Sequence, residues 1–355
     1  MYHWSRFALC LFASMILILP AACLAEETSE TSVRLRQGLE QYPAADANGD
    51  GVLTMTEARA FLAARKAKGS TPRKRPAPKE VDLTTVEKTG KGLWVASTGH
   101  SLVAPALEPF GRAAASAGLD GHRQIRQLSG GASGAPRSHW EKPDSEQVVK
   151  RALATGKCDV LTMGSHSVGS EVEDFARWID LGLKHNPEMV FFVQDAWPYL
   201  TELFDVKGNK TADSDADFER YATATDRFGG WIAERVDALN DKYPGKVHVI
   251  PIGGAMRELV RRQLAGELPG VDAVYVPGRK DAEPGKGQLG LYRDNIHPTG
   301  AVEALEGYLY YACIYKQNPV DLPQGVYPNS ELDQILREVA WKTVIEHPRS
   351  GVTGD

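Results

Sequence analysis

The chain has 355 residues, of which 42% are hydrophobic and 25% are charged, which is the composition of an ordinary globular protein. This length allows a full α/β core together with a small additional module. The formal net charge of −5 argues against nucleic acid as a partner, because proteins that bind it through their surface carry an excess of basic residues.

The N-terminus has the pattern of a targeting segment. Arg6 is followed by an apolar run over residues 7–19 and by small residues that end at Ala25. The run is too short to span a bilayer and is typical of a cleaved secretory signal. We therefore expect residues 1–25 to be removed, which leaves a secreted, periplasmic or cell-envelope protein without a transmembrane helix. The alternative is a lipoprotein that is anchored through Cys23.

Removal of this segment leaves two cysteines, Cys158 and Cys313, each in apolar sequence. Two cysteines do not make a disulfide framework. We expect both to be free, buried thiols.

Residues 26–68 form a small charged helical module whose centre matches the EF-hand calcium loop at every constrained position. Gly51 stands where the loop must turn sharply, and oxygen donors stand at the ligand positions. The predicted Ca²⁺ ligands are Asp46, Asn48, Asp50, Val52 through its carbonyl, Thr54 and Glu57. The alternative is a polar turn rich in Asp and Asn that binds no ion.

Helices are expected on both sides of this loop, over residues 32–41 and 56–66, and Pro43 should end the first one early. The sequence contains one such loop, whereas EF-hands usually occur in pairs. A structural or docking role for calcium therefore fits better than signalling. A dockerin, the alternative module, would need a second loop.

Residues 69–89 are rich in proline and lysine and are expected to be a linker. A larger domain follows over residues 90–345. Apolar runs at 93–96, 159–163, 189–193 and 246–251 predict buried strands, and the patterns at 171–183 and 228–243 predict helices between them. This alternation predicts an α/β fold, a three-layer, doubly wound parallel sheet of flavodoxin-like type. Ligands bind such sheets at the carboxyl ends of the strands, which Ser101, His166 and Asp195 follow.

Two short segments of this domain carry the residues of a serine hydrolase. Ser101 follows Gly99 at the end of the first apolar run, where a tight turn can expose its hydroxyl. Asp294 and His297 lie three residues apart and precede Pro298. At this spacing the carboxylate can bind one imidazole nitrogen, so that the other nitrogen takes the serine proton.

These segments resemble the SGNH, or GDSL-like, hydrolases over roughly residues 90–320. The Gly-Asp-Ser-Leu motif of that family is matched by residues 99–102, with His100 in place of Asp, and its Asp-x-x-His motif is matched by residues 294–297. A long helix over 300–315 follows in the order of the family. The resemblance implies an SGNH-type esterase in which Ser101 is the nucleophile, His297 the base and Asp294 the residue that orients the base.

The resemblance also implies an oxyanion hole with three donors. The N–H of Ser101 is the first, and the N–H of Gly130 or Gly131 is the second. In the family the third is an asparagine side chain, and here His166 occupies that place. A neutral histidine still carries one N–H, so His166 can act as the donor.

The resemblance implies an ester substrate, most often an O-acetyl group on a polysaccharide, and the mechanism requires no cofactor. Trp140, Trp197 and Tyr199 follow predicted strands or the glycine-rich loop, where their rings could stack on sugars, although core packing explains them equally well. In the polar loop 277–293, Arg279 or Arg293 could meet an acidic glycan.

Two other interpretations remain open. His100, His166 and His297 could bind zinc if they met in one pocket, but their spacing matches no zinc motif. Alternatively, the domain could be an inactive SGNH-like binding or envelope protein that docks through its calcium module. The sequence leaves the oligomeric state open.

Overall fold

The structure is a computed structural model that describes residues 28–30, 33–68, 83, 85–203, 218–276 and 289–354. The predicted signal segment 1–25, with Cys23, and Arg279 lie outside the described residues, as does most of the predicted linker 69–89. The chain divides into two compact units, Met1–Val81 and Asp82–Asp355. Within the described residues, no helix combines the length and the apolar character needed to cross a membrane.

In the first unit, the described residues include two α-helices, α1 (Val33–Gln41) and α2 (Met55–Lys68), which flank the predicted calcium loop. Pro43 begins a short 3₁₀-helix directly after α1, in agreement with the expectation that it ends this helix. The buried side chains of Leu35, Ala45 and Leu53 form a small core.

The second unit contains a five-stranded, wholly parallel sheet with the order β2-β1-β3-β4-β5. This is the strand order of flavodoxin-like folds, so the predicted doubly wound α/β architecture is confirmed. The strands are β1 (Trp94–Gly99), β2 (Arg123–Leu128), β3 (Val160–Gly164), β4 (Val190–Gln194) and β5 (Val247–Ile250). A separate parallel pair, β6 (Ala273–Tyr275) and β7 (Gly290–Tyr292), precedes the Asp-x-x-His segment.

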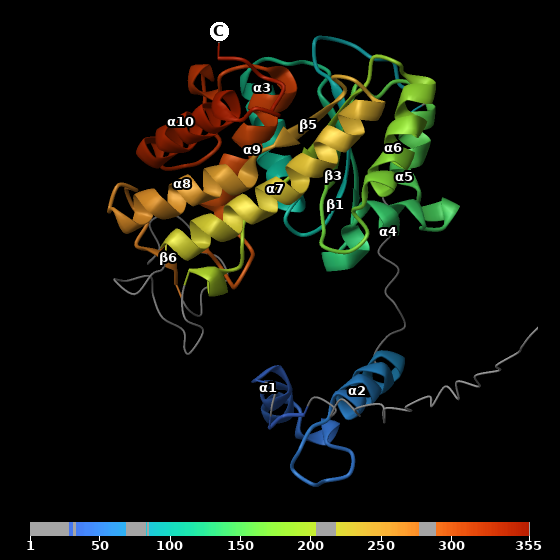
Figure 1. Cartoon of the computed structure of the whole chain (residues 1–355), viewed down its shortest axis with the longest axis vertical. Coiled ribbons are helices and arrows are strands. Elements are labelled where there is room, and N and C mark those ends of the chain that lie inside the picture. The colour runs from blue at the N-terminus through green and yellow to red at the C-terminus, as the bar shows by residue number, and fades with distance from the viewer. Residues whose placement is uncertain are drawn as a thin grey trace, which may run out of the picture. The chain divides into compact units, whose positions relative to one another are not determined.

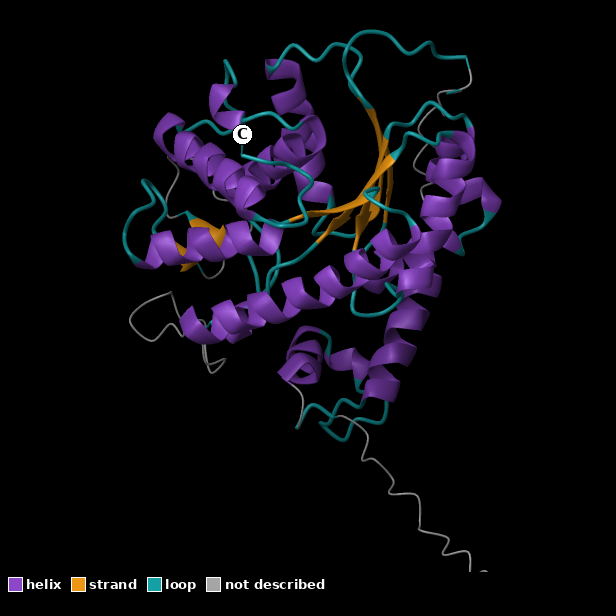
Figure 2. Ribbon diagram, turned by 45° about the horizontal axis from the view of Figure 1, so that its top comes forward, coloured by secondary structure: helices purple, strands orange, loops and turns teal. Residues whose placement is uncertain are grey.

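Helices cover both faces of the large sheet, because successive strand residues point to opposite sides. In β4, for example, Phe192 belongs to one apolar cluster, and its neighbours Phe191 and Val193 belong to the other. Figures 1 and 2 show the resulting layers, with α3, α9 and α10 on one side of the sheet and α5 and α6 on the other. The helices are α3 (Leu107–Ser116), α4 (Pro136–Trp140), α5 (Val148–Ala154), α6 (Val172–His185), α7 (Phe218–Lys242), α8 (Ile252–Leu264), α9 (Gly300–Tyr315) and α10 (Ser330–Glu346).

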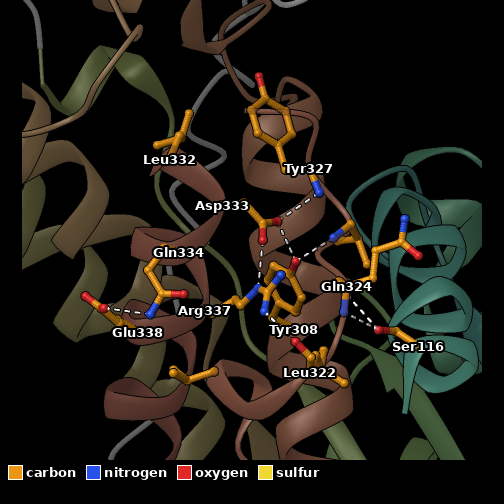
Figure 3. A network of polar contacts seen from close by, with 12 residues as sticks. Ser116, Tyr308, Leu322, Gln324, Tyr327, Leu332, Asp333, Gln334, Arg337 and Glu338 are labelled. Atoms are coloured by element: carbon orange, nitrogen blue, oxygen red, sulfur yellow. Dashed lines mark hydrogen bonds and ion pairs between the residues drawn. The ribbon is translucent and has the colours of Figure 1, made fainter. Parts of the chain in front are cut away.

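A buried polar network joins α9, α10 and the segment between them (Figure 3). The Asp333 carboxylate accepts hydrogen bonds from the Tyr308 hydroxyl at 2.5 Å, the Tyr327 N–H at 2.8 Å and Arg337 Nε at 2.7 Å. Arg337 also donates to the Leu322 carbonyl at 2.9 Å. The network satisfies a buried ion pair and holds α10 against α9, the helix that begins just after His297.

The two cysteines of the described chain, Cys158 and Cys313, are buried and free, as expected. Burial raises the pKa of the Cys158 thiol to about 12 and also raises that of Cys313. Both are therefore protonated, unreactive core residues.

Candidate active site

Ser101 lies in a tight turn at the carboxyl end of β1. The strand ends at Gly99, and the His100 carbonyl accepts hydrogen bonds from the N–H groups of Val103 and Ala104 at 3.0 and 3.1 Å. A Cβ on Gly99 would lie 2.5 Å from the Val103 side chain, so the turn leaves no room for a larger residue. From β1 the chain adds β2 on one side of the sheet and then β3 on the other, so Ser101, at the end of β1, lies at the switch point where such sheets bind ligands.

Ser101, His297 and Asp294 form a continuous chain of hydrogen bonds. Ser101 Oγ lies 2.9 Å from His297 Nε2, and His297 Nδ1 lies 2.8 Å from one Asp294 carboxylate oxygen and 3.0 Å from the other. These distances suit proton transfer from the hydroxyl to the imidazole. The structure thus brings Ser101 together with a histidine and a carboxylate that lie almost 200 positions away in the sequence.

The Asp294–His297 segment is held by its own backbone. Asp294 Oδ1 accepts the N–H groups of Ile296 at 2.9 Å and His297 at 2.8 Å, and the Arg293 N–H donates to the His297 carbonyl at 3.0 Å. An antiparallel bridge between Tyr292 and Pro298 closes the loop. The imidazole is therefore fixed before any substrate binds.

The charge of Asp294 sets the tautomer of His297. Partial burial raises the pKa of the Asp294 carboxyl, but the backbone donors of His297 and Ile296 outweigh it, and the net pKa is lowered. An ionised Asp294 accepts the proton on His297 Nδ1. Nε2 is then unprotonated and can accept the proton of Ser101.

His100 stands at the Asp position of the Gly-Asp-Ser-Leu pattern, and both of its ring nitrogens make hydrogen bonds to the backbone. Its Nδ1 accepts the Leu102 N–H at 3.3 Å, so the ring proton is on Nε2, which donates to the Ser165 carbonyl at 2.6 Å. Burial lowers the pKa of His100, which favours this neutral form. The ring thereby ties the turn after β1 to the turn after β3.

Three further groups that the sequence did not identify support the nucleophile turn. His139 Nε2 lies 3.0 Å from the Gly99 carbonyl oxygen. Gly134 packs so closely against the nucleophile turn that an added Cβ would lie 2.6 Å from the Gly99 carbonyl oxygen and 2.6 Å from His100 Cβ. Gln194 donates to the Leu102 carbonyl at 2.7 Å and accepts the Tyr310 hydroxyl at 2.5 Å.

The glycines predicted for the oxyanion hole lie in the loop after β2, next to the nucleophile turn. The preceding residue, Ser129, donates its N–H to the Gly99 carbonyl at 3.0 Å. Gly130 and Gly131 are exposed, and a Cβ on either would meet nothing within 4 Å. Gly131 has a φ of 52°, a conformation that favours glycine.

His166 lies after β3 and lines a pocket beside the nucleophile turn. Its backbone N–H donates to Ser170 Oγ at 2.9 Å, and its Nδ1 accepts the Val168 N–H at 3.2 Å. The ring proton of the neutral form is therefore on Nε2, for which the described residues show no partner. This leaves one N–H donor of His166 available beside the nucleophile turn.

The zinc interpretation finds no support among the described residues, where no three His, Cys, Asp or Glu side chains gather to hold a metal. The ring nitrogens of His100 bind the Leu102 N–H and the Ser165 carbonyl, and those of His297 bind Ser101 and Asp294. The rings of His100 and His166 pack edge to face, with centroids 5.9 Å apart.

The pocket beside the nucleophile turn has a volume of about 460 Å³. Trp197 and Tyr199 belong to its lining, whereas Trp140 packs against Trp178 in the core on the other face, with ring centroids 5.1 Å apart. The lining also includes Phe228 and Trp231 of α7, which the sequence pattern presented only as part of a helix.

In the first unit, the predicted calcium loop is closed by its own side chains. Asp46 accepts the N–H groups of Gly49 and Gly51, each at 2.8 Å, and Gly51 has a φ of 81°. Hydrogen bonds from Thr54 lower the pKa of Glu57, which favours its carboxylate form. Since the acidic groups here do not gather into a metal-holding cluster by themselves, a cation would also need the neutral oxygens of Asn48, Thr54 and Val52.

No protein-family model matches the chain, and no curated protein matches it. Among solved structures, a DUF4886 family protein from Bacteroides uniformis has a TM-score of 0.49 at 13% identity, over 72% of this chain and 95% of its own. The periplasmic domain of the lipopolysaccharide acetyltransferase of Salmonella ser. Paratyphi A has a TM-score of 0.38 at 9% identity, over 64% and 85%. A Parabacteroides merdae protein described as a GDSL-like lipase has a TM-score of 0.38 at 11% identity, over 63% and 97%. The function must therefore be argued from the geometry of Ser101, His297 and Asp294.

Proposed function

We propose that the chain is a serine ester hydrolase of SGNH type that acts through an acyl-enzyme. The observation that carries this proposal is the hydrogen-bond chain from Ser101 through His297 to Asp294. His297 takes the proton of Ser101 as its oxygen attacks the ester carbonyl, and then gives that proton to the departing alcohol. Water resolves the acyl-enzyme with the help of the same base.

The oxyanion of each step is stabilised by the N–H groups of Ser101 and of the Gly130–Gly131 loop, together with His166 Nε2. The loop's attachment to Gly99 and the available donor on His166 support this assignment. Loss of one such donor typically lowers the rate by about 10²–10³-fold. We expect that loss for His166→Ala, and a smaller one for His166→Asn, which restores an N–H donor.

The test of the proposed function is the hydrolysis of p-nitrophenyl acetate by the purified protein. Ser101→Ala should abolish the turnover, whereas Ser330→Ala, which changes an exposed serine at the start of α10, should leave it intact. Turnover that persists in Ser101→Ala would exclude this serine as the nucleophile. The absence of turnover in every variant would favour the inactive binding protein instead.

We propose an acylated polysaccharide as the natural substrate and the cell exterior or envelope as the place of action. The pattern of residues 1–25 supports export, and Tyr199, with half of its side-chain surface exposed at the pocket, offers a ring face for a sugar. Release of the free acid from acylated polysaccharides, compared with Ser101→Ala, tests the substrate class.

We also propose that loop 46–57 binds Ca²⁺ without a part in catalysis. Its donors are all oxygens, and Gly49 and Gly51 adopt the positive φ that so tight a loop requires. Calorimetry with CaCl₂ should show a Kd of about 10⁻⁴–10⁻³ M, the range of extracellular modules. Glu57→Gln should abolish this binding while the exposed control Glu40→Gln retains it, and equal binding by both variants would refute the site.

A further inference from the structure

The pocket beside Ser101 has apolar walls from several parts of the fold. Leu102 follows the nucleophile and Ile296 precedes His297, so the pocket adjoins both reacting groups. Phe228 and Trp231 come from α7, and Trp197 comes from the segment after β4. A volume of about 460 Å³ is within the range of pockets that enclose most of a drug-sized ligand, and an acetyl group would fill little of it.

The walls are held in place by contacts of the protein itself. The guanidinium of Arg235 stacks 3.9 Å from the Trp231 ring centroid and donates to the Ser170 carbonyl at 2.9 Å. Ser170 in turn accepts the His166 N–H, and Trp197 Nε1 donates to the Ile296 carbonyl at 2.8 Å. Since α7 and the loop after β3 are fixed to each other, the pocket is formed without a ligand.

Several polar groups that line the pocket are already hydrogen-bonded within the protein, whereas the available N–H of His166 is assigned to the oxyanion and the Arg227 side chain is 69% exposed and lies 3.8 Å from Glu202. His100 uses both ring nitrogens, Ser165 donates to the Gln194 carbonyl at 3.0 Å, and the Trp197 indole N–H is already bonded. A sugar ring carries several hydroxyl groups around its rim, and burying them without partners is costly. An apolar ligand group has no such requirement.

Apolar side chains also lie exposed around this pocket. Tyr199, which lines it, is 50% exposed, and Val168, which follows the lining residue Ser167, is 63% exposed. Tyr199 therefore offers its ring face at the pocket, and the apolar walls inside remain for another part of the substrate.

We propose that this pocket binds the acyl group of the ester, and that this group is apolar and larger than acetyl. The inference rests on the proposed function. The polysaccharide alcohol is hydroxylated and extended, so it stays outside the pocket, and the acyl group is the part of the substrate that can be buried. Ser101 then attacks a carbonyl at the pocket mouth.

The kinetic test compares kcat/KM for p-nitrophenyl acetate, butyrate and octanoate. Each step to a longer acyl chain should raise kcat/KM, by roughly tenfold or more in total, because the added methylenes enter an apolar pocket. Trp231→Ala and, as a second variant, Phe228→Ala should remove this preference. Leu264→Ala, which truncates an exposed apolar residue outside the pocket, is the matched control. A preference for acetate, or an equal loss on all three esters in the pocket variants, would overturn the proposal.

A binding measurement separates this inference from the proposed function. Calorimetry on the Ser101→Ala protein should detect octanamide but not acetamide, and Trp231→Ala on that background should abolish the octanamide signal. If the wild type hydrolyses no ester, the proposed function fails, and the calorimetric result still decides what the pocket binds. Absence of octanamide binding to the Ser101→Ala protein would refute the assignment of the pocket.

Discussion

Gly134 offers a sensitive test of whether the nucleophile turn requires its exact position. In Gly134→Ala the new Cβ would lie 2.6 Å from the Gly99 carbonyl oxygen, about 0.8 Å closer than the 3.4 Å at which ordinary contact begins. Both neighbouring groups belong to the β1 turn, so the turn or the glycine-rich loop must move by a comparable distance. A displacement of about 1 Å in a catalytic group can lower the rate by roughly 10²-fold. We expect kcat to fall by roughly 10- to 10²-fold.

Gly254→Ala is the matched control, because Gly254 lies in helix α8 outside the site and its Cβ would make only an ordinary contact, 3.6 Å from the Thr343 side chain. The assay is p-nitrophenyl acetate hydrolysis, with circular dichroism to verify that both variants are folded. Wild-type kcat in a folded Gly134→Ala, or an equal loss in Gly254→Ala, would refute the reasoning.

Three further predictions concern the ionisable groups of Asp195, Asp333 and His297. Burial raises the pKa of Asp195 from 3.8 to about 7, so the folded state keeps a proton that the unfolded state loses, and stability falls as the pH rises through this window. Asp195→Asn should therefore be more stabilising at pH 8 than at pH 5, by about 2–3 kcal/mol in chemical denaturation, and an equal effect at both pH values would contradict this. Asp333→Ala leaves the charge of its buried partner uncompensated and should cost about 3–5 kcal/mol of unfolding free energy. Lys342→Ala, whose ion pair is 63% exposed on both sides, should cost less than about 0.5 kcal/mol, and similar losses in the two variants would refute the buried-pair argument. Acidification should lower kcat/KM, because a protonated His297 cannot accept the serine proton. Asp294 stays ionised longer, since its pKa is lowered. A constant kcat/KM down to about pH 4 would exclude His297 as the base.

Four of the five strands of the large sheet were predictable because they are buried on both faces and therefore appear as continuous apolar runs. The fifth, β2, was missed. It is an edge strand in which Arg123 and Gln124 are half-buried and Arg126 is exposed, so only Ile125 is fully apolar and buried. Helix α7 begins at Phe218 rather than at the predicted Phe228, because polar residues alternate with Tyr221 and Ala224 in its first turns and weaken the apolar pattern.

In the site, too, contacts between residues close in the sequence could be predicted, and contacts between distant residues could not. The Asp294–His297 pairing is made within one turn, so the motif predicts it directly. His100 and His139 gave no such signal, since each supports the nucleophile turn through a carbonyl whose position depends on the fold. The aromatic residues of α7 gave none either, because a helix with Phe228 and Trp231 on one face is typical of core packing.

The sequence by itself determined the parallel α/β architecture and the identity of the residues that can form a serine hydrolase, because burial patterns and turn motifs are local properties of the chain. The tertiary structure decided that Ser101 and His297 meet, since only the sheet brings the end of β1 to the segment before α9. It also decided the shape and polarity of the pocket. These depend on which side chains from distant elements face one another, and on which of their polar groups other parts of the fold already satisfy.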